Sequence, residues 1–322
     1  MKKQNVSIII PTFKRELQIN KILNSLRNQL NNSAQIEILI CDSFSKYKIS
    51  CFPRSKNNFA IRYFNINQNI LSTKRNFGIS KAKYKNIILL DDDCIPDKNF
   101  LKIYLNDFKE IDEKTIISGV VDYPTEYIKK YNHVRYRGLK HFKAEDIKKK
   151  VELPADKIVA MNMGFINSKK INKIRYFDER FIGYGFEDYE FGFRLKKNGF
   201  KLLKTKARII HEEGKPDIKK YIKKYYHLGR DGMKNLLLID QISAKKTIYF
   251  KIENFIFFKL FTKLPKFNYL LLFIEKLIVH IDKYQNMYFS FLYSFLRLSS
   301  YTRGFIDRSK SNLSEKNKNW YE

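Results

Sequence analysis

Three carboxylates stand among aromatic residues in the segment 183–195, GYGFEDYEFGFRL. Acids in such surroundings are costly to bury unless a charge or a hydrogen bond compensates them. Glu187 and Asp188 are therefore candidates for acid–base chemistry. The alternative is an acidic helix N-terminus, which the helix dipole favours. Glu190 lies four residues before Arg194, a spacing that predicts a structural ion pair on one helix face.

A second acidic group, residues 91–93, directly follows the apolar run 86–90 in NIILLDDDCIPD. Three consecutive acids at the end of a buried strand repel one another. A divalent cation that prefers carboxylate oxygens, such as Mg²⁺ or Mn²⁺, removes this repulsion. The alternative is an acidic turn that caps a helix beginning near Asp97.

The elements that must position these acids alternate between strands and helices. The runs 6–10, 36–41, 61–65 and 86–90 are short and apolar, as buried parallel strands are. Helical spacing of apolar residues predicts a helix over 17–30, and a second helix is expected over 73–82. This alternation predicts an α/β fold with an open, mostly parallel sheet flanked by helices. Ligands of such sheets bind at the carboxyl ends of the strands, which is where the acids fall.

The rest of the chain divides near Gly214. Before it, the pattern predicts helices over 97–108 and 186–198, strands over 115–122, 159–167 and 207–211, and a loop over the polar residues 123–150. After it, two long helical patterns cover 218–262 and 268–298. We therefore expect one domain over 1–214 and a helical extension over 215–322. No run of about 18 apolar residues is present, so we expect no membrane-spanning helix.

The composition is strongly basic, with 63 Lys and Arg against 33 Asp and Glu and a formal charge of +30. Such a surface favours polyanions: nucleic acid, anionic lipid or phosphorylated substrates. No helix-turn-helix, zinc-finger or RNP signature is present, so we expect no nucleic-acid partner. Cys41, Cys51 and Cys94 have no C-x-x-C spacing, and the apolar N-terminal run is too short for a signal peptide. Both features favour a cytoplasmic protein.

Five motifs in order carry a family resemblance: VSIIIPTFKR, ILICDSFS, NILSTKRNFGI, LLDDDCIPD and FDERFIGYGFEDYEFGFRLKKNGFKL. Over roughly residues 5–235 the chain resembles the inverting glycosyltransferases of family 2, which have the GT-A fold. The last motif resembles a segment of the β-1,4-galactosyltransferase type. The resemblance implies a nucleotide-sugar-binding half over about 1–100 and an acceptor-binding half over 101–214. It also implies a UDP-sugar donor and a glycan or lipid-linked glycan acceptor.

The same resemblance implies roles for individual residues. For the donor it implies a pocket for the nucleotide base formed by Pro11, Thr12 and Arg15, in which Asp42 holds the base. It places Arg75 and Asn76 on the nucleotide side of the donor. It directs Asp91 and Asp92 toward the ribose and the sugar. Asp93 would bind the metal, Mn²⁺ or Mg²⁺, and His211 would complete its shell. The alternative for His211 is an ordinary hydrogen-bonded histidine. The second strand ends in DSFS, without the second acid and glycine usual in the family, which leaves the base and ribose contacts open.

On the acceptor side, Asp188 matches the family's general base and Glu187 would position the acceptor. The resemblance further implies sugar contacts by four neighbouring residues, Gly183, Tyr184, Gly185 and Phe186. Asn162 would bond the donor or acceptor, with a core position as the alternative. The alternative functions are a nucleic-acid-binding basic protein, a catalytically inactive membrane-associated relative and, with the same fold, a nucleotidyl transferase. The last lacks the glycine-rich phosphate loop expected after its first strand.

The extension 215–322 mixes Phe and Leu with lysines such as Lys259, Lys263, Lys266 and Lys276, and with Arg297. We predict that its helices lie on an anionic membrane surface, which would make the protein a peripheral enzyme of surface-glycan assembly on the inner face of the cell membrane. The alternative is a helical subdomain that packs on the catalytic domain or on a second subunit of a homo-oligomer.

Overall fold

The structure of the chain is a computed structural model, which describes residues 4–30, 34–43, 58–141, 151–284 and 286–308. Its contacts divide the chain into two compact units. The sheet unit comprises Met1–Pro124, His141–Glu179 and Glu187–Glu213, and the helical unit comprises Thr125–Lys140, Arg180–Phe186 and Gly214–Glu322. Each unit thus contains more than one segment of the chain, although the main change from one to the other falls near residue 214.

In the described residues of the sheet unit, nine strands form one mixed sheet. They are β1 (Val6–Thr12), β2 (Ile36–Asp42), β3 (Phe59–Asn65), β4 (Asn86–Leu90), β5 (Cys94–Pro96), β6 (Thr115–Asp122), β7 (Val151–Glu152), β8 (Asn162–Ile166) and β9 (Lys201–His211). The strand order is β3-β2-β1-β4-β8-β6-β9-β5, and β7 also pairs with β9. β1, β2, β3, β4, β6 and β9 run in one direction, while β5, β7 and β8 run against it. This confirms the α/β fold with a mostly parallel sheet.

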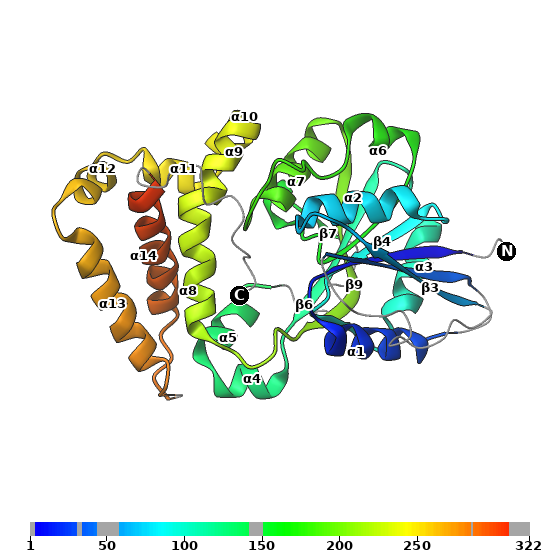
Figure 1. Cartoon of the computed structure of the whole chain (residues 1–322), viewed down its shortest axis with the longest axis horizontal. Helices are drawn as coiled ribbons and strands as arrows, with labels where there is room; N and C mark the ends of the chain where they lie inside the picture. The colour runs from blue at the N-terminus through cyan, green and yellow to red at the C-terminus, as the bar shows by residue number, and fades with distance from the viewer. Residues whose placement is uncertain (1–3, 31–33, 44–57, 142–150, 285, 309–322) are drawn as a thin grey trace. The chain divides into compact units, whose positions relative to one another are not determined.

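Helices cover both faces of this sheet (Figure 1). α1 (Glu16–Arg27) and α3 (Phe100–Glu110) pack on one face, and α2 (Leu71–Lys81), α6 (Lys169–Ile174) and α7 (Glu187–Lys197) pack on the other. β1 shows why both faces need cover: Ile8 and Ile10 enter the first core and Ile9 enters the second. A strand buried on both sides reads as a continuous apolar run, which is why the sequence pattern identified these strands.

The stretch 123–150 differs from the expected loop. It contains α4 (Thr125–Lys130) and α5 (Asn132–Gly138), while residues 142–150 lie outside the described residues. α5 buries Val134 and Tyr136, and Tyr136 belongs to the core of the helical unit. Its helix therefore depends on partners more than a hundred residues later in the chain, which local periodicity does not reveal.

The helical unit also differs from its expected form. The pattern 218–262 is not one long helix but α8 (Ile218–His227), a π-helical turn (Leu228–Gly232), α9 (Met233–Ile239), α10 (Gln241–Lys246), α11 (Ile248–Glu253) and α12 (Ile256–Lys263). Two capping residues explain the breaks: Asp240 accepts hydrogen bonds from the amides of Ile242 and Ser243, and Thr247 accepts one from Phe250. α13 (Phe267–Ile281) and α14 (Ser290–Arg308) follow.

Within this unit α14 packs against both α13 and α8, as Figure 1 shows. Its core contains Tyr136, Tyr221, Ile278, Tyr293 and Leu296. In the described part of the chain, every helix is too short or too polar to cross a membrane.

Candidate functional site

The acids at the end of β4 meet the end of β1. β1 and β4 are parallel neighbours, so both strands end at the same edge of the sheet. The Thr12 hydroxyl donates a 2.8 Å hydrogen bond to the Asp92 carboxylate. The Arg15 guanidinium lies 3.1 Å from Asp92 and 2.7 Å from an oxygen of Asp93. A positive group thus already lies between two carboxylates that would otherwise repel each other.

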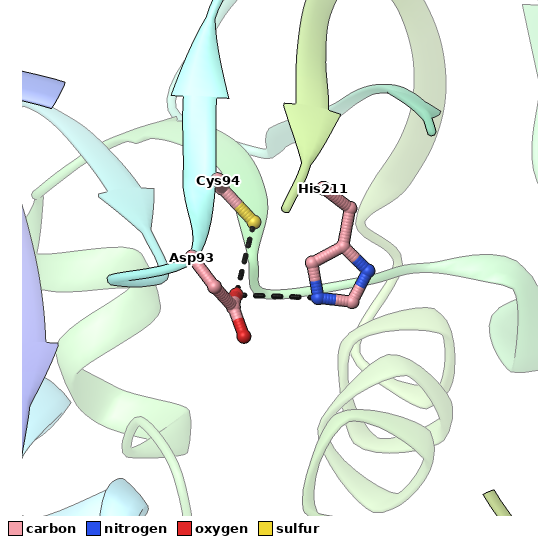
Figure 2. A group of neighbouring side chains, drawn as sticks. All are labelled: Asp93, Cys94 and His211. Carbon is pink, nitrogen blue, oxygen red and sulfur yellow. Dashed lines mark hydrogen bonds and ion pairs between the residues drawn. The ribbon is translucent and has the colours of Figure 1, made fainter. Parts of the chain in front are cut away.

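Asp93 also faces His211, because the antiparallel register of β5 and β9 sets Cys94 opposite His211. The imidazole Nε2 lies 3.2 Å from the Asp93 carboxylate, and the Cys94 thiol lies 3.6 Å from the same oxygen (Figure 2). The imidazole also lies 3.4 Å from Glu213, and its ring packs against Tyr123 at 5.5 Å between centroids.

This group fits a divalent cation. The ligand atoms of Asp93, Cys94 and His211 all lie within 4.8 Å of one another. The carboxylate oxygen suits Mn²⁺ or Mg²⁺, the metals expected from the sequence, whereas an imidazole nitrogen is a more usual ligand of Zn²⁺ and other transition metals. Burial, together with Asp93 and Asp91, raises the pKa of the Cys94 thiol well above its usual value, so Cys94 stays protonated and donates to Asp93. Sequence reasoning missed Cys94, which adjoins the acids without any spacing motif.

Arg75 of α2 joins the two acidic groups of the sequence. Its guanidinium lies 2.9 Å from Asp91, 3.3 Å from Asp188 and 3.5 Å from Glu187, and it rests over the ring of Phe177. The side chain is only 1% exposed. Burial opposes the charged guanidinium, but the three carboxylates outweigh it and raise the pKa of Arg75 above its usual value. Arg75 therefore lies beneath the carboxylates, whereas the sequence placed it beside the nucleotide.

Asp188 is the candidate general base. It lies in the first turn of α7, and one carboxylate oxygen accepts a 2.9 Å hydrogen bond from the Ala160 amide. Burial and the neighbouring charge of Glu187 raise the pKa of Asp188 to about 7, against the opposing effect of Arg75. A carboxyl group with a pKa near neutrality is well matched to take a proton from a hydroxyl. One turn later Arg194 lies 2.6 Å from Glu190, which confirms the structural ion pair.

Lys74 is a second buried cation that sequence reasoning missed. Its ammonium donates to the Thr12 carbonyl at 2.7 Å and to the Asn69 side chain at 2.6 Å. Burial lowers its pKa to about 8, although Asp42 and Asp92 act in the opposite direction. The burial of Lys74 could have been suspected from the two consecutive cations in NILSTKRNFGI. On a helix that packs on a sheet, two adjacent cations cannot both reach solvent freely.

Asp42 and Asn76 are both engaged in protein contacts. The Asp42 carboxylate is fully buried and accepts hydrogen bonds from the Tyr63 hydroxyl and the Ser43 amide, both at 2.7 Å. The Asn76 amide group binds the backbone of Phe177 in both directions, at 2.8 and 3.1 Å. Asn76 therefore fixes the chain next to Arg75. Pro11, the remaining residue of the expected base pocket, is buried in β1.

Asn162 does not join the site. It is fully buried in β8, where its oxygen accepts from the Tyr104 hydroxyl at 2.7 Å. Its nitrogen donates to the carbonyls of Val120 and Ala207 at 3.0 and 2.9 Å. These bonds use its hydrogen-bonding groups within the core, so the expected contact to donor or acceptor is corrected to a core position, the alternative that the sequence left open.

The segment with Gly183, Tyr184, Gly185 and Phe186 groups with the helical unit. Three of these residues have positive φ: 95° and 97° at the glycines and 72° at Phe186. That conformation costs little for glycine but is strained for phenylalanine, and such strain is concentrated at functional sites. The Phe186 ring packs edge-on against Tyr249. The segment continues directly into Glu187 and the helix of the candidate base.

Comparisons with known proteins agree with the motifs. The family model described as glycosyl transferase family 2 matches residues 7–174. Hyaluronan synthase of Pasteurella multocida is 30% identical over 60% of this chain and 23% of its own length. Chondroitin synthase of Pasteurella multocida (strain Pm70) is 27% identical over 62% of this chain and 23% of its own length. The chain thus spans about a quarter of the length of these curated relatives.

A solved structure extends the likeness over nearly all of the chain. The crystal structure of Staphylococcus aureus TarS 1–349 in complex with UDP-GlcNAc has a TM-score of 0.52. It is 15% identical, and the match covers 95% of this chain and 91% of that one. At this identity the likeness concerns the fold, and it agrees with the expected GT-A class. The family model covers more than half of the chain, and the chain belongs to glycosyl transferase family 2.

Proposed function

We propose that the protein is a metal-dependent inverting glycosyltransferase that moves a hexose or N-acetylhexosamine from a UDP-sugar to a hydroxyl of a glycan. One observation carries the proposal. A carboxylate with a pKa near 7, Asp188, and a cation-binding pair, Asp93 and His211, are connected through Arg75 and the consecutive acids 91–93 at one edge of the sheet. Inverting transfer needs both groups, because it displaces a diphosphate and deprotonates a hydroxyl.

In the proposed reaction Asp188 accepts the acceptor's hydroxyl proton while that oxygen bonds to the anomeric carbon. The bond between this carbon and the UDP oxygen breaks on the opposite face, and UDP leaves with the electron pair. Asp93 and His211 would hold Mn²⁺ or Mg²⁺, which would offset the negative charge of the leaving diphosphate. Glu187 raises the pKa of Asp188, and Arg75 keeps both carboxylates in place.

The donor assignment has two supports. The family transfers sugars from nucleotide donors, and the TarS structure with a similar fold holds UDP-GlcNAc. Thr12 and Arg15 are the expected donor contacts that lie at the acids, whereas Arg75 and Asn76 are engaged beneath the surface. The proposed acceptor is a lipid-linked oligosaccharide, lipopolysaccharide or capsule glycan, and the proposed location is the cytoplasmic face of the cell membrane.

Calorimetry with UDP in the presence of Mn²⁺, of Mg²⁺ and of a chelator tests the metal and donor assignments together. We expect Asp93→Asn to bind UDP equally weakly with and without metal, whereas the wild type binds more tightly with metal. Asp97→Asn is the matched control, because Asp97 lies at the other end of β5 and pairs with Arg208. It should behave as the wild type does.

A screen of nucleotide-sugars with mass detection of the products then identifies the sugar. Metal-independent UDP binding by the wild type would remove the metal from the proposal. Metal-dependent UDP binding without consumption of any nucleotide-sugar, with or without acceptor, would instead identify a catalytically inactive relative.

A further inference from the structure

The outer helices of the helical unit carry apolar side chains that the other described residues of that unit leave exposed. In α12 no residue is buried. In α13 the buried residues are Leu271, Glu275 and Ile278, which share one helix face. Ile274 and Val279 pack partly against the same core, and most other residues of the two helices are exposed.

This open surface is apolar where a solvated helix would be polar. Six large side chains on it are each at least 50% exposed: Phe257, Leu260, Phe261, Leu264, Leu270 and Phe273. We call these residues, together with Lys259, Lys263, Lys266 and Lys276, the outer face. Large apolar side chains that are exposed together on two successive helices indicate a contact with a partner or a membrane.

The charges of the outer face have one sign. Its four lysines are exposed. Between residues 254 and 306 the sequence contains two acids, Glu275 and Asp282, and both are buried. Glu275 lies 2.5 Å from Arg303, and Asp282 accepts from the Tyr293 hydroxyl and pairs with His133. All acidic charge in this stretch therefore points inward, and the surface charge is positive.

We propose that the outer face binds the surface of a bilayer with anionic headgroups, with its aromatic and leucine side chains in the interface and its lysines at the phosphates. Exposed apolar side chains beside lysines on short helices are the pattern of interfacial binding. None of the described helices can span the bilayer, so the contact lies along its surface. A second copy of the chain fits less well, because the two outer faces would oppose lysine to lysine.

Only the choice of the cytoplasmic membrane face rests on the proposed function. Lipid binding itself is measurable without any sugar transfer. The test is sedimentation of the full chain with phosphatidylcholine vesicles and with vesicles that also contain phosphatidylglycerol. We expect the protein to pellet with the anionic vesicles at low salt and to be partly released by salt. A wild type that stays in the supernatant overturns the inference, and if it still binds UDP the proposed function survives.

The lysines are tested by Lys259→Gln, Lys263→Gln and Lys276→Gln in one variant. Each lysine near an anionic surface changes the partition coefficient by about fivefold, so this variant should bind on the order of 100-fold more weakly. The control is Lys98→Gln, Lys102→Gln and Lys109→Gln, an equal change in net charge at exposed positions in and next to α3. If both variants lost vesicle binding equally, the net charge of the protein and not the outer face would cause the binding.

The apolar side chains are tested by Leu260→Ser with Phe273→Ser, at positions that are 57% and 65% exposed. The control is Leu17→Ser with Leu238→Ser, which are exposed leucines outside the outer face. We expect the first variant to lose the binding that remains at high salt, and the control to keep it. If the first variant instead dissociates an oligomer in light scattering and binds vesicles as before, a second copy covers the face and the inference fails.

Discussion

At the candidate site of the sheet unit two buried cations balance carboxylates that remain partly exposed, whereas around α13 of the helical unit two acids are buried and the lysines lie outside. Arg75 and Lys74 are nearly inaccessible, while Asp91 and Asp188 remain partly exposed. Glu275 and Asp282 show the reverse arrangement, within a core. A buried ion pair contributes little net stability by itself, but removal of one partner leaves a costly unpaired charge.

The comparison separates two uses of the same residue types. A buried cation beneath exposed acids gathers several carboxylates at one place and leaves some of their oxygen atoms accessible to a ligand. A buried acid beneath exposed lysines removes negative charge from a surface. The first arrangement serves chemistry and the second serves contact with an anion, so substitutions in the two units should have different consequences.

The largest effect is expected from Asp188→Asn in the sheet unit. Loss of the proposed base should lower kcat by about 10²–10⁴ and leave UDP-sugar binding nearly unchanged, since the base acts on the acceptor hydroxyl. Product formation by chromatography and donor binding by calorimetry measure the two properties separately. Glu190→Gln, two residues further along α7 in the ion pair with Arg194, is the control and should lower stability without this loss of kcat. Turnover of Asp188→Asn within a few-fold of the wild type would exclude Asp188 as the base.

The next effect is expected from Glu275→Gln in the helical unit. Arg303 then keeps its charge without its buried partner, which should cost about 3 kcal/mol of the free energy of unfolding. Urea denaturation followed by circular dichroism measures this, and kcat of the folded protein should not change. The control Glu113→Gln breaks an exposed pair with Lys170 and should cost less than about 1 kcal/mol. Equal stability of the two variants would remove the contrast between the units.

The smallest effect concerns pH. The base form of Asp188 is the ionised one, so kcat/KM should rise with pH through a midpoint near 7 and then level off. Arg75 favours the ionised form, and Arg75→Gln should therefore move the midpoint upward, by about one pH unit or more. Arg75→Lys keeps a positive charge and should recover part of the shift. An unchanged midpoint in Arg75→Gln would mean that another group controls the profile.

The fold was largely predictable from the sequence because the central strands are buried on both faces and α1 and α3 have regular apolar periods. β1 and α1 are examples, with an unbroken apolar run and buried residues three or four apart. The short strands β5 and β7 and the helices α4, α5 and α6 were not predicted. Their form depends on pairing with β9 or on distant cores, and the pattern of neighbouring residues does not encode these contacts.

In the site, Asp91, Asp92 and Asp93 could be placed at the sheet edge because they follow β4, whereas Glu187 and Asp188 begin α7 and were assigned by the family resemblance. The cations could not be placed in the same way. Arg75, Lys74 and Asn76 are consecutive on α2, and tertiary packing alone decides which of them faces a carboxylate, a carbonyl or the backbone of Phe177. Asn162 shows the same limit, since its position on a strand gave no sign of three partners in the core.

The interleaving of the chain has a consequence for its synthesis. His133 on α5 pairs with Asp282, 149 residues later, and Tyr136 pairs with Ser294 at a separation of 158. At ribosomal rates of about 5–20 residues per second, roughly 7–30 s pass between the emergence of α5 and that of its partners. For that time the nascent chain can complete most of its sheet while α5 still lacks its core, and a pause in translation near residue 214 would prolong its exposure to proteases and chaperones.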